Sequence, residues 1–298
     1  MKVLVTGASG FLGRYVAERL ALAHEVIGTY LNNDASVPGC DMRRVDLADP
    51  GALAALICEE EPDAVVHTAA AARPDLCESA PESARTINVE SSIAGARAAQ
   101  ETGARFYFTS SDLVFDGTNS PYRENEKPNP LSVYAKMKLE AEKGIKEACP
   151  SSLILRLSLL FGWTKGEGET FTEELHRKLH TGESVRLFSD QKRAALYVRD
   201  ASEMIVQLVE MAHDPGSYEG IFHLAGPAAV SRLRFGETLC DVFDFDRNLI
   251  EAVKMADVPS KAPRPLDCSL DGERLCLALR YRPRTVLMAL RDMLVRVP

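Results

Sequence analysis

Three glycines near the start of the chain restrict the fold more than any other feature. Gly7, Gly10 and Gly13 lie in the segment TGASGFLGRYV, directly after the apolar run KVLV and before a helical pattern. This spacing suits a tight turn from a strand into a helix, in which the backbone closely approaches a ligand and the helix packs on the strand. The free N–H groups at the helix start favour an anion. We therefore expect the pyrophosphate of a dinucleotide at this turn.

Apolar runs alternate with helical patterns through the first half of the chain. Six strands are expected by residue 158, and the intervening helices are expected over residues 12–22, near Leu53, and over residues 86–100 and 133–147. This alternation is typical of a parallel sheet with helices on both faces. We therefore predict an α/β fold, a Rossmann-type doubly wound parallel sheet.

The second half of the chain is less regular. Helices are expected over residues 171–180, 201–213 and 234–243, with short strands between them. We predict a dinucleotide-binding domain over residues 1–160 and a smaller substrate-binding lobe over residues 161–298. Segments near residues 196–200 and 221–225 can return to the first domain.

Composition excludes several classes of protein. The 298 residues are 46% hydrophobic and carry a net charge of −8, which argues against a nucleic-acid-binding surface. The seven cysteines include no CxxC pair and follow no secretory signal, so we expect reduced thiols. No apolar run reaches the roughly 18 residues of a membrane helix. We therefore expect a cytoplasmic protein that contacts neither membrane nor nucleic acid.

The end of the second expected strand bears on the choice of cofactor. The segment GTYLNND has no acidic residue directly after the strand, where a carboxylate would bind the ribose 2′-hydroxyl and repel a 2′-phosphate. This favours NADP, with Asn32, Asn33 and Arg14 in the neighbourhood of the 2′-phosphate. Asp34 is close enough to keep NAD as an alternative. Further along, Asp46 and Leu47 follow the third strand, where an adenine ring lies in this fold.

A second group of residues, Tyr134, Lys138 and Ser111, is typical of a catalytic site. Tyr134 and Lys138 lie four apart on an expected helix, so their side chains share one face. An ammonium beside a phenol favours the phenolate and lowers the pKa of the tyrosine, which makes it a better acid. Ser111 ends the preceding strand, at the edge where ligands bind in open α/β sheets. The three residues together predict a carbonyl reductase, in which Ser111 orients the carbonyl oxygen and Tyr134 donates the proton.

The segments TGASGFLG, HTAA, SSDLVFDG and YAKMK, with Asn88, resemble the extended short-chain dehydrogenases/reductases. The long run from SSDLVFDG to YAKMKLEAEK and the late segment APRPLDCSLD are similar to dTDP-4-dehydrorhamnose reductases and to the regulatory β subunit of methionine adenosyltransferase. The resemblance implies catalytic roles for Ser111, Tyr134 and Lys138, substrate contacts from Asp112 and Arg264, and a homodimer. The cofactor-binding residues expected are Gly7, Ser9, Gly10, Phe11, Leu12, Gly13, Asn32, Asp46, Leu47, Thr68, Ala69, Ala70, Asn88, Ser110, Tyr134, Lys138 and Leu157.

The chain departs from the reductase pattern at two positions. Leu113 and Leu159 stand where those reductases have Tyr and Trp, which face the sugar nucleotide. We therefore expect an NADP-dependent reductase whose substrate is a 4-keto sugar nucleotide or a related carbonyl compound. Two alternatives stay open: a non-catalytic NADP-binding regulatory subunit, and an NAD-dependent sugar-nucleotide epimerase or dehydratase.

Three further features have simpler explanations. His176 and His180 are four apart, but the charged residues around them favour a solvated helix face, and we expect no metal site. Lys192 and Arg193 are candidates to face a diphosphate, from their position alone. Trp163 fits either a substrate pocket or the packing between the lobes.

Overall fold

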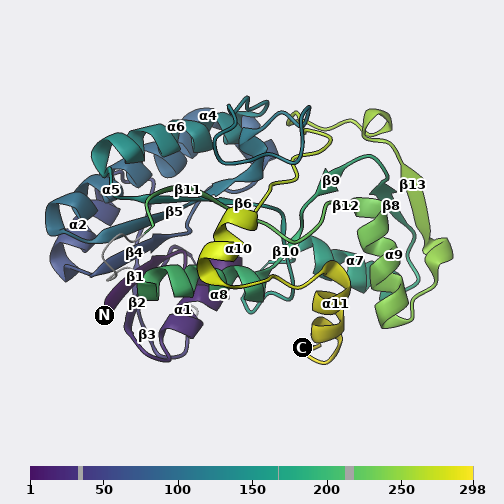
Figure 1. Ribbon diagram of the computed structural model, residues 1–298, viewed down its shortest axis with the longest axis horizontal. Helices are drawn as coiled ribbons and strands as arrows, with labels where there is room; N and C mark the ends of the chain where they lie inside the picture. Colours follow the sequence, from purple (N-terminus) through teal and green to yellow (C-terminus); the bar gives the residue numbers. More distant parts are fainter. Residues whose placement is uncertain (33–35, 167, 212–217, 298) are drawn as a thin grey trace.

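The computed structural model describes residues 1–32, 36–166, 168–211 and 218–297. Its central element is one parallel sheet in the strand order β11-β6-β5-β4-β1-β2-β3 (Figure 1). These strands are β1 (Lys2–Thr6), β2 (Glu25–Tyr30), β3 (Cys40–Arg44), β4 (Ala64–His67), β5 (Arg105–Ser111), β6 (Leu153–Leu157) and β11 (Gly220–Leu224). The predicted doubly wound α/β fold is confirmed.

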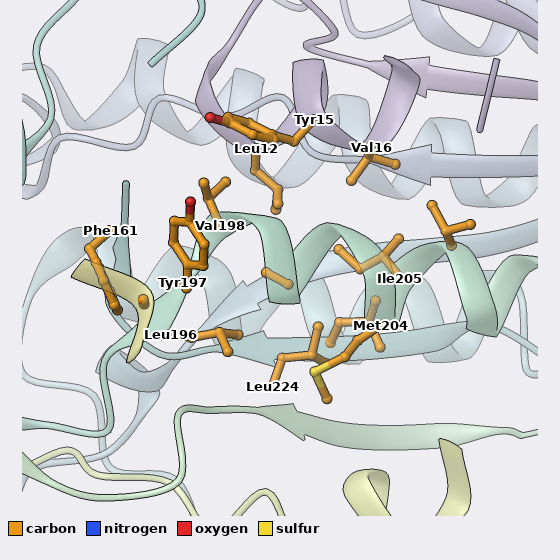
Figure 2. Packing of buried hydrophobic residues seen from close by; sticks show 14 of the residues in the cluster. Leu12, Tyr15, Val16, Phe161, Leu196, Tyr197, Val198, Met204, Ile205 and Leu224 are labelled. Atoms are coloured by element: carbon orange, nitrogen blue, oxygen red, sulfur yellow. The ribbon is translucent and has the colours of Figure 1, made fainter. Parts of the chain in front are cut away.

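Helices cover both faces of the sheet because successive strand residues point to opposite sides. Val3 and Val5 of β1 belong to one apolar cluster, with residues of α1 (Phe11–Leu20) and α8 (Val198–Glu210). Figure 2 shows Leu12 and Val16 of α1 facing Ile205 of α8. The opposite cluster contains residues of α2 (Ala52–Glu60), α5 (Ser91–Thr102) and α6 (Val133–Ala148).

The region after β4 differs from the single helix expected over residues 86–100. Two short helices come first, α3 (Pro74–Ser79) and α4 (Pro81–Arg85), each with proline in its first turn. A π-helical turn, Thr86–Glu90, then leads into α5. The wider turn leaves Asn88 buried, with its amide bonded to the loop after β4. The start of the expected helix is therefore wrong, and π turns of this kind are frequent at functional sites.

The rest of the chain builds a smaller region beside the sheet, at the right of Figure 1. Its strands form the pairs β10-β7, β12-β9 and β13-β8. The elements are β7 (Leu160–Phe161), α7 (Phe171–His180), β8 (Val185–Phe188), β9 (Lys192–Arg193), β10 (Leu196–Tyr197), β12 (Val230–Ser231), α9 (Arg232–Phe243), β13 (Ile250–Val253), α10 (Glu273–Leu279) and α11 (Val286–Leu294). Among the described residues, 3₁₀ turns form at Asp112–Val114, Arg247–Leu249 and Met255–Asp257.

Two strands from the second half of the chain, β10 and β11, coincide with the segments near residues 196–200 and 221–225 that can return to the first domain. β11 forms the edge of the main sheet beside β6, and β10 pairs with β7, just beyond β6. The division at residue 160 stays a prediction. Residues 212 and 213, the expected end of the helix over residues 201–213, lie outside the described residues.

Several other sequence features take simple structural positions. The seven cysteines are free thiols. Trp163 packs at the junction between the regions, where its indole N–H donates to the Met293 carbonyl at 3.0 Å. His176 and His180 stack on each other beside Phe243 and Phe245. Among the described helices, none is long and apolar enough to cross a membrane.

Candidate active site

A cavity of about 1080 Å³ runs along the carboxyl ends of the central strands. It contains every expected site residue except Asn88. From the expected set it is lined by Gly7, Ser9, Gly10, Phe11, Leu12, Gly13, Asn32, Asp46, Leu47, Thr68, Ala69, Ala70, Ser110, Ser111, Asp112, Tyr134, Lys138, Leu157 and Arg264. The fold thus brings residues far apart in sequence to one surface, at the sheet edge where open α/β folds bind ligands.

The glycine turn between β1 and α1 leaves room for a ligand that side chains would fill. Gly7 has a φ of +66°, which favours glycine. A Cβ on Gly13 would lie 2.2 Å from the Gly7 carbonyl oxygen, so only glycine allows the helix to pack so near the turn. Gly10 caps α1 without a side-chain hydrogen bond. The first N–H groups of the helix are therefore available to an anion, and the turn fits a pyrophosphate.

The loop after β4 is held in place from two sides. The Thr6 hydroxyl accepts hydrogen bonds from the N–H groups of Thr68 and Ala69, both at 3.1 Å. The amide of Asn88 accepts from the Ala71 N–H at 2.9 Å and donates to the Ala71 carbonyl at 3.2 Å. Asn88 therefore lies behind the cavity wall rather than in it, which corrects its expected place among the lining residues. It acts on the loop through Ala71.

The adenosine end of the cavity is formed by the ends of β2 and β3. Asn32 and Asp46 both line it. Arg14 does not: its guanidinium donates to Glu18 at 3.0 Å and to the Ser36 carbonyl at 3.4 Å. Its expected place near a 2′-phosphate is therefore taken by contacts within the protein. The other two residues considered there, 33 and 34, lie outside the described residues.

Ser111, Tyr134 and Lys138 lie together at the end of β5 and the start of α6, and all three are buried. Ser111 hydrogen-bonds Tyr134, and the Ser111 hydroxyl lies 3.3 Å from an Asp112 carboxylate oxygen. Lys138 donates to the Thr109 carbonyl at 2.9 Å, and its Nζ lies 6.0 Å from the centre of the Tyr134 ring. The arrangement places a hydroxyl, a phenol and an ammonium beside one cavity.

The ionisation of Tyr134 differs from the expectation. Burial raises the pKa of Tyr134 well above its ordinary value, and the negative charges of Asp112 and Cys77 raise it further. Burial also lowers the pKa of Lys138 to about 8, although Glu142 partly offsets this. The expectation that Lys138 lowers the pKa of Tyr134 is therefore wrong for this structure. The consequence is a phenol that keeps its proton at neutral pH.

A buried ion pair between Glu142 and Arg156 contacts the end of β5 through Ser110. Glu142, on the same face of α6 as Lys138, accepts two hydrogen bonds from Arg156 of β6, at 3.0 and 2.7 Å. The Ser110 hydroxyl donates to the same carboxylate at 2.5 Å. Both charged side chains are less than 5% exposed. Ser110 is thus oriented by the protein, although it lines the cavity.

The far end of the cavity contains several charged side chains. Asp112 lies 3.4 Å from the buried Arg193, and Arg264 pairs with Asp75 at 2.8 Å. Burial raises the pKa of Asp112, and Arg193 counteracts that shift. Of the two basic residues singled out by position, Arg193 lines the cavity, whereas Lys192 is exposed and does not.

Arg232 is different because no carboxylate pairs with it among the described residues. Its Nε donates to the Gln191 side chain at 3.2 Å and its guanidinium lies 4.2 Å from the centre of the Phe171 ring. One terminal guanidinium nitrogen is buried without a hydrogen-bond partner. Burial and the nearby Arg193 lower the pKa of Arg232 to about 9, so it stays charged at neutral pH. A cavity-lining cation with one buried N–H group that lacks a partner among the described residues favours an anionic ligand.

Sequence reasoning missed Arg232 and Gln191. Neither stands in a motif: Arg232 opens α9 and Gln191 precedes β9, and only the fold brings them together. By contrast, Leu113 and Leu159 were singled out, and both line the cavity near these polar groups. The substrate end therefore combines an apolar wall with a cationic one.

Known proteins with similar sequences include a probable reductase and a methionine adenosyltransferase subunit. The sequence profile of the RmlD substrate binding domain matches residues 1–297. Methionine adenosyltransferase 2 subunit beta of Danio rerio is 33% identical, across 98% of this chain and 90% of that protein. The "Probable low-salt glycan biosynthesis reductase Agl14" of Haloferax volcanii is also 33% identical, across 91% of this chain and 90% of that protein.

Solved structures give the same result. A hypothetical dTDP-4-dehydrorhamnose reductase from Sulfolobus tokodaii superposes with a TM-score of 0.81 at 30% identity, over 92% of this chain and 93% of that one. The dTDP-4-dehydrorhamnose reductase from Yersinia enterocolitica gives 0.85 at 26% identity, over 99% and 98%. The chain belongs to the family of the RmlD substrate binding domain, as the sequence resemblance predicted.

Proposed function

We propose that this protein is an NADP-dependent reductase of a 4-keto sugar nucleotide or a related anionic carbonyl compound. The observation that carries the proposal is the meeting of Ser111, Tyr134 and Lys138 in the same cavity as the glycine turn. The reductases among its relatives and structural neighbours support it.

The residues present account for the steps that the protein must perform. A nicotinamide dinucleotide held by the glycine turn and the loop after β4 would supply a hydride for the carbonyl carbon. The Ser111 hydroxyl orients the carbonyl oxygen toward Tyr134, whose phenol gives its proton to that oxygen to form the alcohol. Because burial holds the pKa of Tyr134 high, the phenol is protonated and ready to donate at neutral pH. Lys138 places a positive charge near the phenolate that remains.

The charge at the far end of the cavity supports an anionic substrate. Arg193 and Arg264 each form an ion pair with a carboxylate, whereas Arg232 forms none among the described residues. A sugar nucleotide carries a diphosphate. One of its oxygens would accept a hydrogen bond from the guanidinium nitrogen of Arg232 that has no partner among the described residues. Leu113 and Leu159 then provide an apolar wall for the sugar.

The test is oxidation of NADPH, followed at the nicotinamide absorbance band with a panel of 4-keto sugar nucleotides. We expect substrate-dependent oxidation, and we expect Tyr134→Phe to abolish most of it. An epimerase or dehydratase would instead convert the sugar nucleotide with no net loss of NADPH, and that outcome would contradict the proposal.

A second function has its own support. The methionine adenosyltransferase subunits among the relatives match nearly the whole chain, so a dinucleotide-binding regulatory subunit is the competing proposal. Tight NADPH binding without turnover of any panel member, together with co-purification of a methionine adenosyltransferase, would favour it over the reductase.

A further inference from the structure

We propose that Arg44, at the end of β3 and bonded to the backbone that follows β2, binds the 2′-phosphate of NADP and sets the preference for NADP over NAD. The inference rests on the proposed dinucleotide site. It goes beyond that site because it assigns cofactor choice to the third strand, not to the segment after the second.

The position of Arg44 is fixed by the sheet. β3 pairs with β2 in parallel, so Arg44 lies directly beside Tyr30, the last residue of β2. The Nε of Arg44 donates to the Leu31 carbonyl at 3.1 Å. Leu31 and Asn32 line the cavity where β2 ends, which is where the adenosine ribose of a dinucleotide lies in this type of fold.

The other basic residues near this end are already paired. Arg14 and Lys165 both bond Glu18. Arg43 pairs with Asp41 and Glu60. Within the part of the chain that the structure describes, Arg44 has no carboxylate partner, and its bond to Leu31 uses only Nε.

Arg44 also has the right geometry for a phosphate. A guanidinium held by Nε still presents the N–H groups of its two terminal nitrogens in a planar fork, which suits two phosphate oxygens at once. Asp46, which lines the cavity two residues after Arg44, accepts a hydrogen bond from the Ala48 N–H at 2.9 Å and forms no ion pair with Arg44 among the described residues. The backbone carbonyl of Leu31 thus holds a guanidinium that has no carboxylate partner among the described residues, next to the stretch of cavity wall formed by Leu31 and Asn32.

The experiment is calorimetric titration of the full chain with four probes: NADPH, NADH, adenosine 2′,5′-bisphosphate and adenosine 5′-monophosphate. For Arg44→Gln we expect affinity for the two 2′-phosphorylated probes to fall about 10- to 100-fold, as charge-assisted hydrogen bonds are lost. Affinity for NADH and the monophosphate should stay unchanged. Arg43→Gln, the neighbouring exposed arginine, is the matched control and should leave all four affinities unchanged.

Other outcomes would overturn the inference. They are an equal loss for all four probes in Arg44→Gln, an unchanged ratio of NADPH to NADH affinity, or a loss of discrimination in Arg14→Gln instead. A wild-type chain that prefers NADH would also overturn it. Because the readout is binding, the result is separate from turnover: a protein that oxidises no NADPH can still depend on Arg44 for choosing it.

Discussion

The two ends of the cavity are built in different ways. At the dinucleotide end, the ligand-facing surface is largely backbone: the glycine turn, the start of α1 and the loop after β4. At the substrate end it consists of long side chains from separate segments, among them Arg193, Arg232 and Arg264. A backbone site fixes where a common cofactor binds, whereas a side-chain site can change its ligand through single substitutions. The two ends of the cavity therefore differ in how readily single substitutions can change the ligand that binds there.

Tyr134 lies where the two ends meet, and its loss should have the largest effect. Tyr134→Phe removes only the proton donor, so we expect turnover to fall by about 10² to 10⁴, typical of a single general acid. NADPH affinity should stay within about twofold by calorimetry, since the ring remains. Unchanged turnover would show that another group donates the proton.

Arg232 tests the substrate end alone. Arg232→Gln removes a cation that has no ion-pair partner among the described residues, so we expect KM for an anionic substrate to rise about 10- to 100-fold, in line with a lost charge-assisted hydrogen bond. NADPH affinity should not change. The matched control is Arg234→Gln, an exposed residue of the same helix that pairs with Glu237, and it should leave both quantities as they are. A substrate with no negative charge should be indifferent to Arg232.

Gly13 tests the dinucleotide end alone. Gly13→Ala would place a Cβ 2.2 Å from the Gly7 carbonyl, so the turn must shift, at a cost of about 1 to 3 kcal/mol. We expect NADPH affinity to fall about tenfold or more by calorimetry. Gly51→Ala is the control, because its Cβ would meet nothing closer than 3.5 Å. Equal binding in both variants would mean that the turn does not contact the dinucleotide.

The pH dependence of turnover should give a smaller effect. Burial lowers the pKa of Lys138 to about 8, so the ammonium is lost as pH rises above that value while Tyr134 stays protonated. We expect turnover to fall about tenfold per pH unit above that point, because neutral Lys138 no longer stabilises the phenolate. In Lys138→Arg the charge persists and the decline should move to higher pH. A profile that is the same in both proteins would remove Lys138 from this role.

The lowered pKa of Lys138 also affects the pH dependence of folding stability. Rising pH increases stability, whereas it decreases turnover. Between pH 8 and the ordinary lysine value of 10.5, the unfolded chain holds a proton on Lys138 that the folded chain has released. Stability therefore rises with pH through this window as far as Lys138 is concerned. Chemical denaturation of Lys138→Met should lack this component of the pH dependence.

The contrast between the two ends also explains what the sequence could predict. The glycine turn and the pair Tyr134 and Lys138 are local patterns. Their residues are close in sequence, so they can be recognised without knowledge of the tertiary structure. Arg232 meets Gln191 only because β12, which directly precedes α9, pairs with β9, and no short segment encodes that pairing.

The errors of the sequence reading have the same origin. Asn88 is expected among the cofactor-binding residues, but the π turn around it directs its amide to Ala71, and it does not line the cavity. The pKa of Tyr134 is expected to fall, but burial by the surrounding elements raises it, and Asp112 and Cys77 raise it further. Both depend on tertiary packing, which the spacing of residues cannot give.

Transfer of deuterium tests the central claim most directly. The protein would be incubated with NADPH deuterated at the reactive carbon of the nicotinamide and with a 4-keto sugar nucleotide, and the product would be analysed by mass spectrometry and NMR. The account predicts one deuterium at the former carbonyl carbon for each NADPH consumed, and almost none with Tyr134→Phe. Bound NADPH that passes its label to no carbonyl compound, in a protein with the cavity intact, would contradict it.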